Sequence, residues 1–90
     1  MLEIRASNRF KRDLKLLSKR GLNLDLLEAV VQKIACQIQL EPKYQDHPLT
    51  GDYDGFRECH ILPDWLLIYR IDDDGVYLFL SRSGSHSDLF

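Results

Sequence analysis

Four residues able to take part in acid–base or phosphate chemistry, and one tryptophan, stand at the ends of predicted strands in the second half of the chain. His60 ends one strand-like segment, Asp64 and Trp65 open the next, and Arg82 and His86 follow the third. In an up-down-up meander, the end of the first strand, the start of the second and the end of the third share one edge. The pattern therefore predicts that these side chains gather there.

These residue types suit the cleavage of RNA without a metal. A histidine can give or take a proton near neutral pH, so two histidines can divide the work of general base and general acid. Arginine stays charged, and its fork matches phosphate oxygens, so it can stabilise a phosphorane-like transition state. Aromatic rings can stack on bases. Attack by a 2′-hydroxyl would leave a 2′,3′-cyclic phosphate and a 5′-hydroxyl.

Each of these residues also has an ordinary structural interpretation. A histidine at a strand end is usually a surface or capping residue, Trp65 alone fits a core position, and Arg82 alone fits a salt bridge. A zinc site made of the three histidines and Asp64 is a second functional interpretation. No histidine pair has the HxH or HExxH spacing, so we expect no metal.

The first 40 residues predict a short strand followed by a helical hairpin. Residues 2–5 alternate as a strand, and Ser7 or Asn8 can cap a first helix. A glycine marks its end, and a second helix is expected from about Asn23 to about Leu40, ahead of a proline.

The second half predicts a loop and three strands. Residues 41–55 are rich in proline, glycine and aspartate, and a loop of this length in a compact domain is often functional. Strands are expected over 55–62, 65–71 and 76–81, joined by short turns such as DDDG. The middle strand is apolar on both faces, so we expect it to be central and covered by the helices. The fold class is α+β, with residues 1–90 forming a single domain.

Charge is distributed unevenly along the chain. Residues 1–40 hold eight Lys/Arg and four Asp/Glu, whereas residues 41–90 hold four Lys/Arg and ten Asp/Glu. A basic first helix favours a polyanion or an acidic partner, although a solvated helix face explains it equally well. Apolar leader and membrane-span patterns are missing from the sequence, so the cytoplasm is the expected compartment. The two cysteines are expected to be reduced and buried.

The second half resembles the YafQ branch of the RelE/ParE superfamily, the toxins of type II toxin–antitoxin pairs. Its sequence reads DHPLTGDYDGFRECHILPDWLLIYRI, followed by LSRSGSHSDLF. The family pattern is DHPL-x-G, then G-[FY]-R-[DE]-x-H, PDW-[IL]-L-I-Y, and R-[ST]-G-[ST]-H with LF close behind. Every piece is present in order over about residues 44–90, while the first half agrees only in outline.

The resemblance implies a RelE-like microbial-ribonuclease fold. In it, an N-terminal strand and a two-helix hairpin pack on an antiparallel sheet of about four strands. The resemblance also implies a ribosome-dependent mRNA endonuclease that inhibits translation and needs neither metal nor cofactor. Expected partners are a cognate antitoxin, in a hetero-oligomer, and the ribosome with its mRNA, and no membrane is involved.

The resemblance also implies catalytic roles for five residues. His86 is the expected general acid, and Arg82 would stabilise the transition state. His47, from the DHPL motif, is the expected general base, with Asp64 or His60 as alternatives.

Further residues are implied in binding. Trp65 and Phe90 would order the substrate bases. The exposed cations of the first helix would contact the ribosome: Lys11, Arg12, Lys15 and Lys19. Asp88 stands where a small apolar residue is more usual in the family, and we expect it to raise the pKa of His86.

Two other functions share this architecture. A ParE-like toxin poisons gyrase and lacks the histidine and arginine constellation, so the presence of His47, Arg82 and His86 argues against it. An inactive homologue that only binds its antitoxin is the other alternative.

Overall fold

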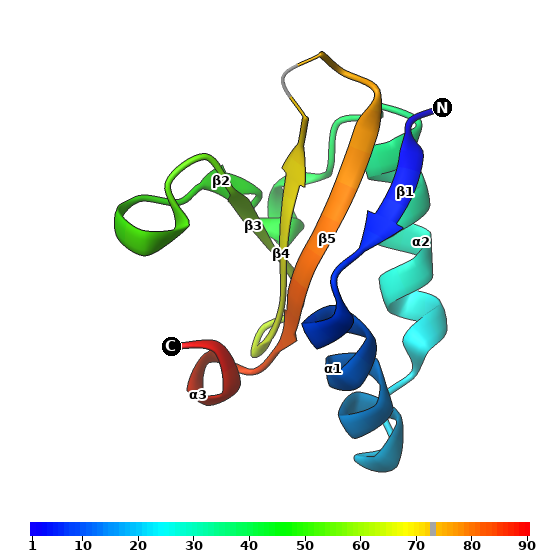
Figure 1. Ribbon diagram of the computed structural model, residues 1–90. Helices are drawn as coiled ribbons and strands as arrows, with labels where there is room; N and C mark the ends of the chain where they lie inside the picture. The colour runs from blue at the N-terminus through cyan, green and yellow to red at the C-terminus, as the bar shows by residue number, and fades with distance from the viewer. Residues whose placement is uncertain (73) are drawn as a thin grey trace.

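The computed structural model describes residues 1–72 and 74–90, so the middle of the predicted DDDG turn lies outside the described residues. One mixed five-stranded sheet, in the order β1-β5-β4-β3-β2, carries the two long helices on one face (Figure 1). The elements are β1 (Glu3–Ala6), α1 (Asn8–Lys19), α2 (Leu24–Ala35), the 3₁₀ turn η1 (Pro42–Tyr44), β2 (His47–Pro48), the 3₁₀ turn η2 (Gly51–Tyr53), β3 (Arg57–Leu62), β4 (Trp65–Ile71), β5 (Tyr77–Gly84) and α3 (His86–Leu89).

The sheet differs from the expected four antiparallel strands. The meander β3-β4-β5 is antiparallel as predicted, but β1 pairs with β5 in parallel, with Glu3 opposite Tyr77 and Ala6 opposite Leu80. The long connection between these two strands allows the parallel alignment. The fifth strand, β2, is a two-residue segment of the predicted loop, in which His47 pairs with Glu58.

Both long helices begin where the sequence predicts. The Ser7 hydroxyl accepts from the Phe10 amide at 2.9 Å, and α1 ends before Gly21, whose φ of 81° favours glycine. The Asn23 side chain accepts from the Asp25 amide at 3.0 Å and caps α2.

Helix α2 ends five residues earlier than predicted. Gln37 adopts a left-handed φ of 59°, and the Ile38 amide donates back to the Lys33 carbonyl at 2.9 Å. This Schellman-type ending stops the helix at Ala35, although the apolar spacing continues to Leu40.

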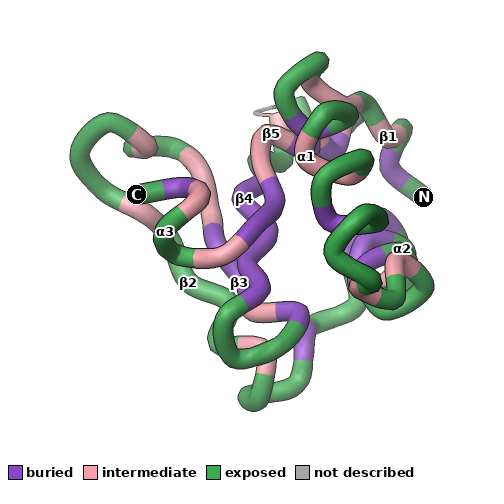
Figure 2. Tube along the Cα trace, turned by 90° about the horizontal axis from the view of Figure 1, so that it is seen from below, coloured by how far each residue is buried: buried purple, intermediate pink, exposed green. Residues whose placement is uncertain are grey.

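The central strand β4 takes part in two cores. Its inward residues on one face, Trp65, Leu67 and Tyr69, pack with the helices, while Leu66 and Ile68 are fully buried on the opposite face. The second face is covered by Leu89 of α3 and by three side chains of the 41–56 segment: Leu49, Tyr53 and Phe56. The expectation that helices α1 and α2 cover both faces is therefore wrong, as the view in Figure 2 makes clear.

Two further expectations can be compared with the structure. The helices of the described residues are all too short or too polar to cross a membrane. Cys59 is buried, as predicted, but Cys36 is exposed at the end of α2.

The adjacent leucines of α1 offer a matched test of this packing. Leu17 is 1% exposed and Leu16 is 44% exposed. We expect Leu17→Ala to lower the free energy of unfolding by about 2–5 kcal/mol, because it leaves a cavity in the main core. Leu16→Ala should cost far less. Urea denaturation of both variants checks this, and equal losses would contradict the burial pattern.

Candidate active site

A buried carboxylate lies between two histidines on the sheet face opposite the helices. Glu58 pairs with Ile68 and His60 pairs with Leu66, so both side chains share that face. Glu58 is 5% exposed. Its Oε1 lies 3.6 Å from His60 Nε2 and 3.8 Å from His47 Nε2. The second nitrogen of each ring also faces an oxygen, because His47 Nδ1 lies 2.6 Å from the Gln45 carbonyl and His60 Nδ1 lies 3.2 Å from a prolyl carbonyl.

The third histidine is held by Asp64 from the β3–β4 turn. Asp64 Oδ1 accepts from the His86 backbone amide at 3.1 Å and lies 2.6 Å from His86 Nδ1. These hydrogen bonds from His86 lower the pKa of Asp64. With Nδ1 donating to Asp64, the other ring nitrogen is the one left to exchange a proton with a substrate. The rings of His60 and His86 lie 5.8 Å apart.

Arg82 lies within β5 rather than after it, and Asp13 of α1 fixes it. Its Nε and Nη2 donate to the two carboxylate oxygens of Asp13 at 2.8 and 3.2 Å, and the Ser83 amide donates to the same group at 3.0 Å. The hydrogen bond to Asp13 raises the pKa of Arg82, with a smaller contribution from Tyr53. Arg82 is thus a fixed, permanently charged group whose remaining N–H donors are not used by Asp13.

A second ion pair connects α1 to the C-terminal turn. Arg20 donates to both carboxylate oxygens of Asp88 at 2.7 and 3.1 Å. Asp88 and Ser85 also form a capping box at the start of α3. An added Cβ on Gly84 would lie 2.8 Å from Asp88 Oδ2, so this close approach requires glycine. The hydrogen bond from Arg20 holds the pKa of Asp88 well below its usual range. The sequence predicted that Asp88 acts on the pKa of His86. In the described residues, however, the Asp88 carboxylate contacts Arg20 and Ser85 rather than the His86 ring.

The two predicted stacking residues have different positions. Trp65 is 2% exposed, and its indole nitrogen donates to the Ser83 hydroxyl at 3.0 Å. It shares the helix-covered face with Leu67, so its ring is part of the main core, which does not favour the predicted stacking on a base. Phe90 is 65% exposed and lies 5.9 Å from the ring of Tyr53, so it is accessible to a ligand.

The four cations predicted to contact the ribosome are all exposed on α1, most of which Figure 2 colours as exposed residues. They are Lys11, Arg12, Lys15 and Lys19.

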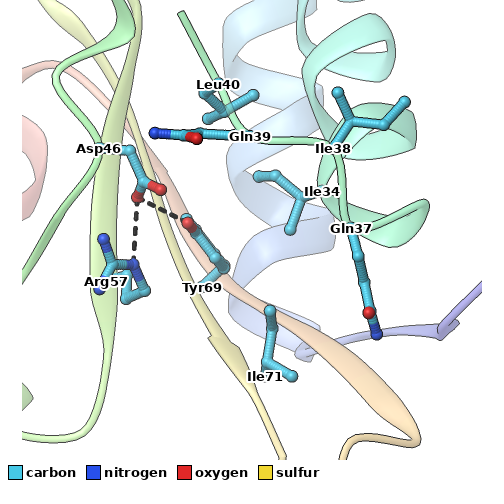
Figure 3. A pocket seen from close by; sticks show the side chains of 9 residues that line it. All are labelled: Ile34, Gln37, Ile38, Gln39, Leu40, Asp46, Arg57, Tyr69 and Ile71. Atoms are coloured by element: carbon cyan, nitrogen blue, oxygen red, sulfur yellow. Dashed lines mark hydrogen bonds and ion pairs between the residues drawn. The ribbon is translucent and has the colours of Figure 1, made fainter. Parts of the chain in front are cut away.

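Asp46 anchors the loop that delivers His47. It accepts from the Tyr69 hydroxyl at 2.6 Å and from Arg57 Nε at 3.3 Å (Figure 3). Burial, followed by the hydrogen bond to Asp46, raises the pKa of Tyr69. This anchor borders a groove of about 440 Å³ between α2 and the sheet. Because Asp46 directly precedes His47, it helps to place that ring beside Glu58.

Glu58 and Asp13 were not among the predicted site residues. Glu58 could have been found, because it stands two residues before His60 in a predicted strand and must share its face. Asp13 carried no such signal, since its partner Arg82 is 69 positions away in sequence.

The same cluster could hold a metal ion. One ligand atom from each of Glu58, His60 and His86 lies within 4.8 Å of the others. A carboxylate with two imidazoles is a ligand set that suits zinc. The zinc site considered from sequence consisted of the three histidines and Asp64. In the structure, Glu58 joins His60 and His86 in place of Asp64 and His47.

Comparisons with known proteins identify the family and the fold of this chain. A family model described as "Bacterial toxin of type II toxin-antitoxin system, YafQ" matches residues 2–90. The mRNA interferase toxin YafQ of Escherichia coli K12 is 35% identical over 89 residues, covering 98% of this chain and 95% of the relative. A metal-bound toxin from Helicobacter pylori is 52% identical, with a TM-score of 0.93 and full coverage of both chains. YafQ in the E. coli DinJ–YafQ toxin–antitoxin complex is 34% identical, with a TM-score of 0.89, covering 99% and 97%.

The fold and the matches define a small α+β protein of the type II toxin class, and the RelE-like fold expected from the resemblance is confirmed. Within that class, the chain belongs to the YafQ family.

The ion pair between Arg20 and Asp88 predicts a pH dependence of stability. The pKa of Asp88 is depressed in the folded protein, so its ionised form stabilises the fold above the ordinary carboxyl pKa of about 4. That contribution is lost as the pH falls below this value. We therefore expect Asp88→Asn to destabilise the protein at pH 7 and to differ less from wild type at pH 3.

Urea denaturation across this pH range measures the difference. Glu28→Gln, at an exposed position of α2, is the control for removing a carboxylate. A difference between wild type and Asp88→Asn that stays constant with pH would contradict the ion pair.

Proposed function

We propose that this chain is the toxin of a type II toxin–antitoxin system and that it cleaves mRNA on the ribosome. The single observation that carries the proposal is the convergence of Glu58, His60 and His86 on one small space, with His86 held by Asp64. The printed name of the E. coli relative, an mRNA interferase, supports the same activity.

We assign the general base to Glu58. In His47 and in His60, Nδ1 faces a backbone carbonyl, which can only accept, so Nδ1 is the donating nitrogen of each ring. The other nitrogen, Nε2, faces the Glu58 carboxylate at 3.8 Å in His47 and 3.6 Å in His60. The carboxylate between them is left as the acceptor for the 2′-hydroxyl proton.

His86 is the general acid of the proposed reaction. Asp64 orients its ring through Nδ1, so Nε2 can protonate the departing 5′-oxygen. The attacking 2′-oxygen forms a bond to phosphorus as the bond to the 5′-oxygen breaks, and the products are a 2′,3′-cyclic phosphate and a 5′-hydroxyl.

Arg82 would stabilise the charge that develops on the phosphate. Glu58, Ile68 and Arg82 form one row across β3, β4 and β5. The backbones of the two outer strands are therefore roughly 10 Å apart, a span that the Arg82 side chain can shorten. Asp13 holds one side of the guanidinium and thereby leaves the other N–H groups to the substrate.

Two macromolecular partners belong to the proposal. The ribosome would present the mRNA and contact the exposed cations of α1, because an acidic protein binds phosphate weakly by itself. A cognate antitoxin is proposed because an E. coli relative occurs in a toxin–antitoxin complex. A gyrase-poisoning function would leave the histidine cluster without a role.

Substitution of the acid and the base tests the assignment. We expect His86→Gln and Glu58→Gln each to lower the cleavage rate about 10²–10⁴-fold, the usual contribution of a proton-transfer group. The measurement is 5′-end mapping of a defined mRNA in a reconstituted translation system. Lys33→Gln, which removes a half-buried cation of α2 that lies 3.7 Å from Glu41, is the control.

Wild-type rates in the His86→Gln variant would sink the site assignment. Full activity in Glu58→Gln, together with loss in His60→Gln, would move the general base to His60.

Metal dependence provides a separate test. A Zn²⁺ or Cu²⁺ ion bound by Glu58, His60 and His86 would occupy the atoms needed for proton transfer. We expect added Zn²⁺ to inhibit cleavage, and a chelator selective for transition metals to leave it unchanged while Mg²⁺ keeps the ribosome intact. Loss of activity on chelation, restored by Zn²⁺, would instead indicate metal-assisted cleavage.

A further inference from the structure

A set of stacked guanidinium and aromatic groups lies on the sheet away from the reacting residues. The Arg70 guanidinium is 5.1 Å from the ring centre of Phe56 and 5.5 Å from that of Phe79. The Arg5 guanidinium is 3.7 Å from the ring centre of Tyr77. We call these five residues the arginine–aromatic face. None of them has a part in the proposed acid–base chemistry.

The strand register places this face on the same side of the sheet as the active site. Phe79 pairs with Arg70 of β4 and with Arg5 of β1, so these three side chains stand in one row. Arg70 is two residues after Ile68, and alternate residues of a strand share a face. Ile68 in turn pairs with Arg82. The arginine–aromatic face is therefore an extension of the surface that holds the active site.

Ring contacts also connect this face to the C-terminal turn. The Tyr53 ring lies 5.9 Å from Phe56 and 5.9 Å from Phe90. Phe90 stands four residues after His86 in the sequence. An extended ligand held at His86 could thus continue over Phe90, Tyr53 and Phe56 toward β5.

The face is open to solvent. Arg5 and Arg70 are exposed, and Tyr77 and Phe79 are half-buried. Figure 1 shows α1 and α2 on the other side of the sheet, with α3 beside its lower end. Glu3 lies 3.6 Å from Arg5, but both side chains are more than half exposed, so this pair is weak competition for a phosphate.

We infer that the arginine–aromatic face binds the stretch of single-stranded mRNA that flanks the cleaved bond. Bases can stack on half-buried aromatic rings and on the planes of arginines, and the guanidinium forks match phosphate oxygens. Of the four Lys/Arg residues in the acidic second half of the chain, Arg70 lies on this face, where it offsets the repulsion of a polyanion. This inference rests on the proposed function, since the strand is the substrate of the same site.

An RNA strand fits these observations better than a protein partner does. The face alternates cations with aromatic rings and is continuous with the site that the substrate must enter. Two exposed aliphatic side chains, which would suit a protein interface, instead line the groove between α2 and the sheet: Ile38 and Ile71.

The first measurement is an NMR titration of isotope-labelled protein with a 2′-O-methyl oligouridylate, which cannot be cleaved. We expect amide shifts along β1, β4 and β5 at the arginine–aromatic face. Tyr77→Leu, which keeps an apolar side chain but removes the ring, should weaken binding about fivefold or more. Tyr77→Phe keeps the ring and should bind as wild type does.

The second measurement is steady-state cleavage on programmed ribosomes. Tyr77→Leu and Arg70→Gln should raise KM several-fold and leave kcat unchanged, because neither residue reaches the reacting atoms. Lys33→Gln, on the helical side, should change neither constant. A purely structural defect would instead lower kcat and stability together.

The outcomes separate this inference from the proposed function. Wild-type cleavage with unchanged KM in both variants would overturn the inference and leave the proposed function standing. Absence of wild-type cleavage would overturn the proposed function, while the NMR titration would still decide on RNA binding. Two other results would show that this face does not bind RNA. One is a set of amide shifts confined to α1, and the other is a loss of affinity for the antitoxin alone in the variants.

Discussion

The structure depends on a central strand that is apolar on both faces. Helices α1 and α2 cover one face of β4, and Leu66 and Ile68 on the other face need a separate cover, because apolar surface left in water costs about 25 cal/mol per Å². That cover comes from Leu89 of the C-terminal turn and from the segment that follows β2. The C-terminal turn carries His86, and the other segment directly follows the strand that carries His47, so the packing of the small second core brings both imidazoles to β3.

Helix α1 connects the folding of the chain to the geometry of the site. Asp13 and Arg20 are seven residues apart, about two helical turns, so they point to the same side. One holds Arg82, and the other holds the turn that begins at His86. Both ion pairs raise the pKa of the arginine, and the second also depresses that of Asp88, so the charges are fixed at neutral pH. The exposed lysines of the same helix take part in neither of these two ion pairs and face solvent.

Much of this arrangement follows from local sequence, and the rest depends on distant contacts. Period-two alternation and short turns predicted the meander, and its topology brought Asp64 to His86 and placed His60 nearby. The strand β1 was predicted, but sequence pattern could not predict its parallel pairing with β5 or the Asp13–Arg82 pair, because both join residues about 70 positions apart. The family motif that contains Trp65 does not determine which face of the sheet its ring occupies, so the motif could not predict that the ring is buried. The early end of α2 came from the left-handed Gln37, which apolar spacing does not reveal.

The central claim is that Glu58 and His86 exchange protons with the substrate. The chemical identity of the cut ends tests this claim most directly. The measurement is mass spectrometry of the fragments that wild-type protein releases from ribosome-bound mRNA. The account predicts a 2′,3′-cyclic phosphate on the upstream fragment and a 5′-hydroxyl on the downstream one. A 3′-hydroxyl with a 5′-phosphate would mean that water, rather than the 2′-hydroxyl, attacks the phosphorus, and would contradict the account.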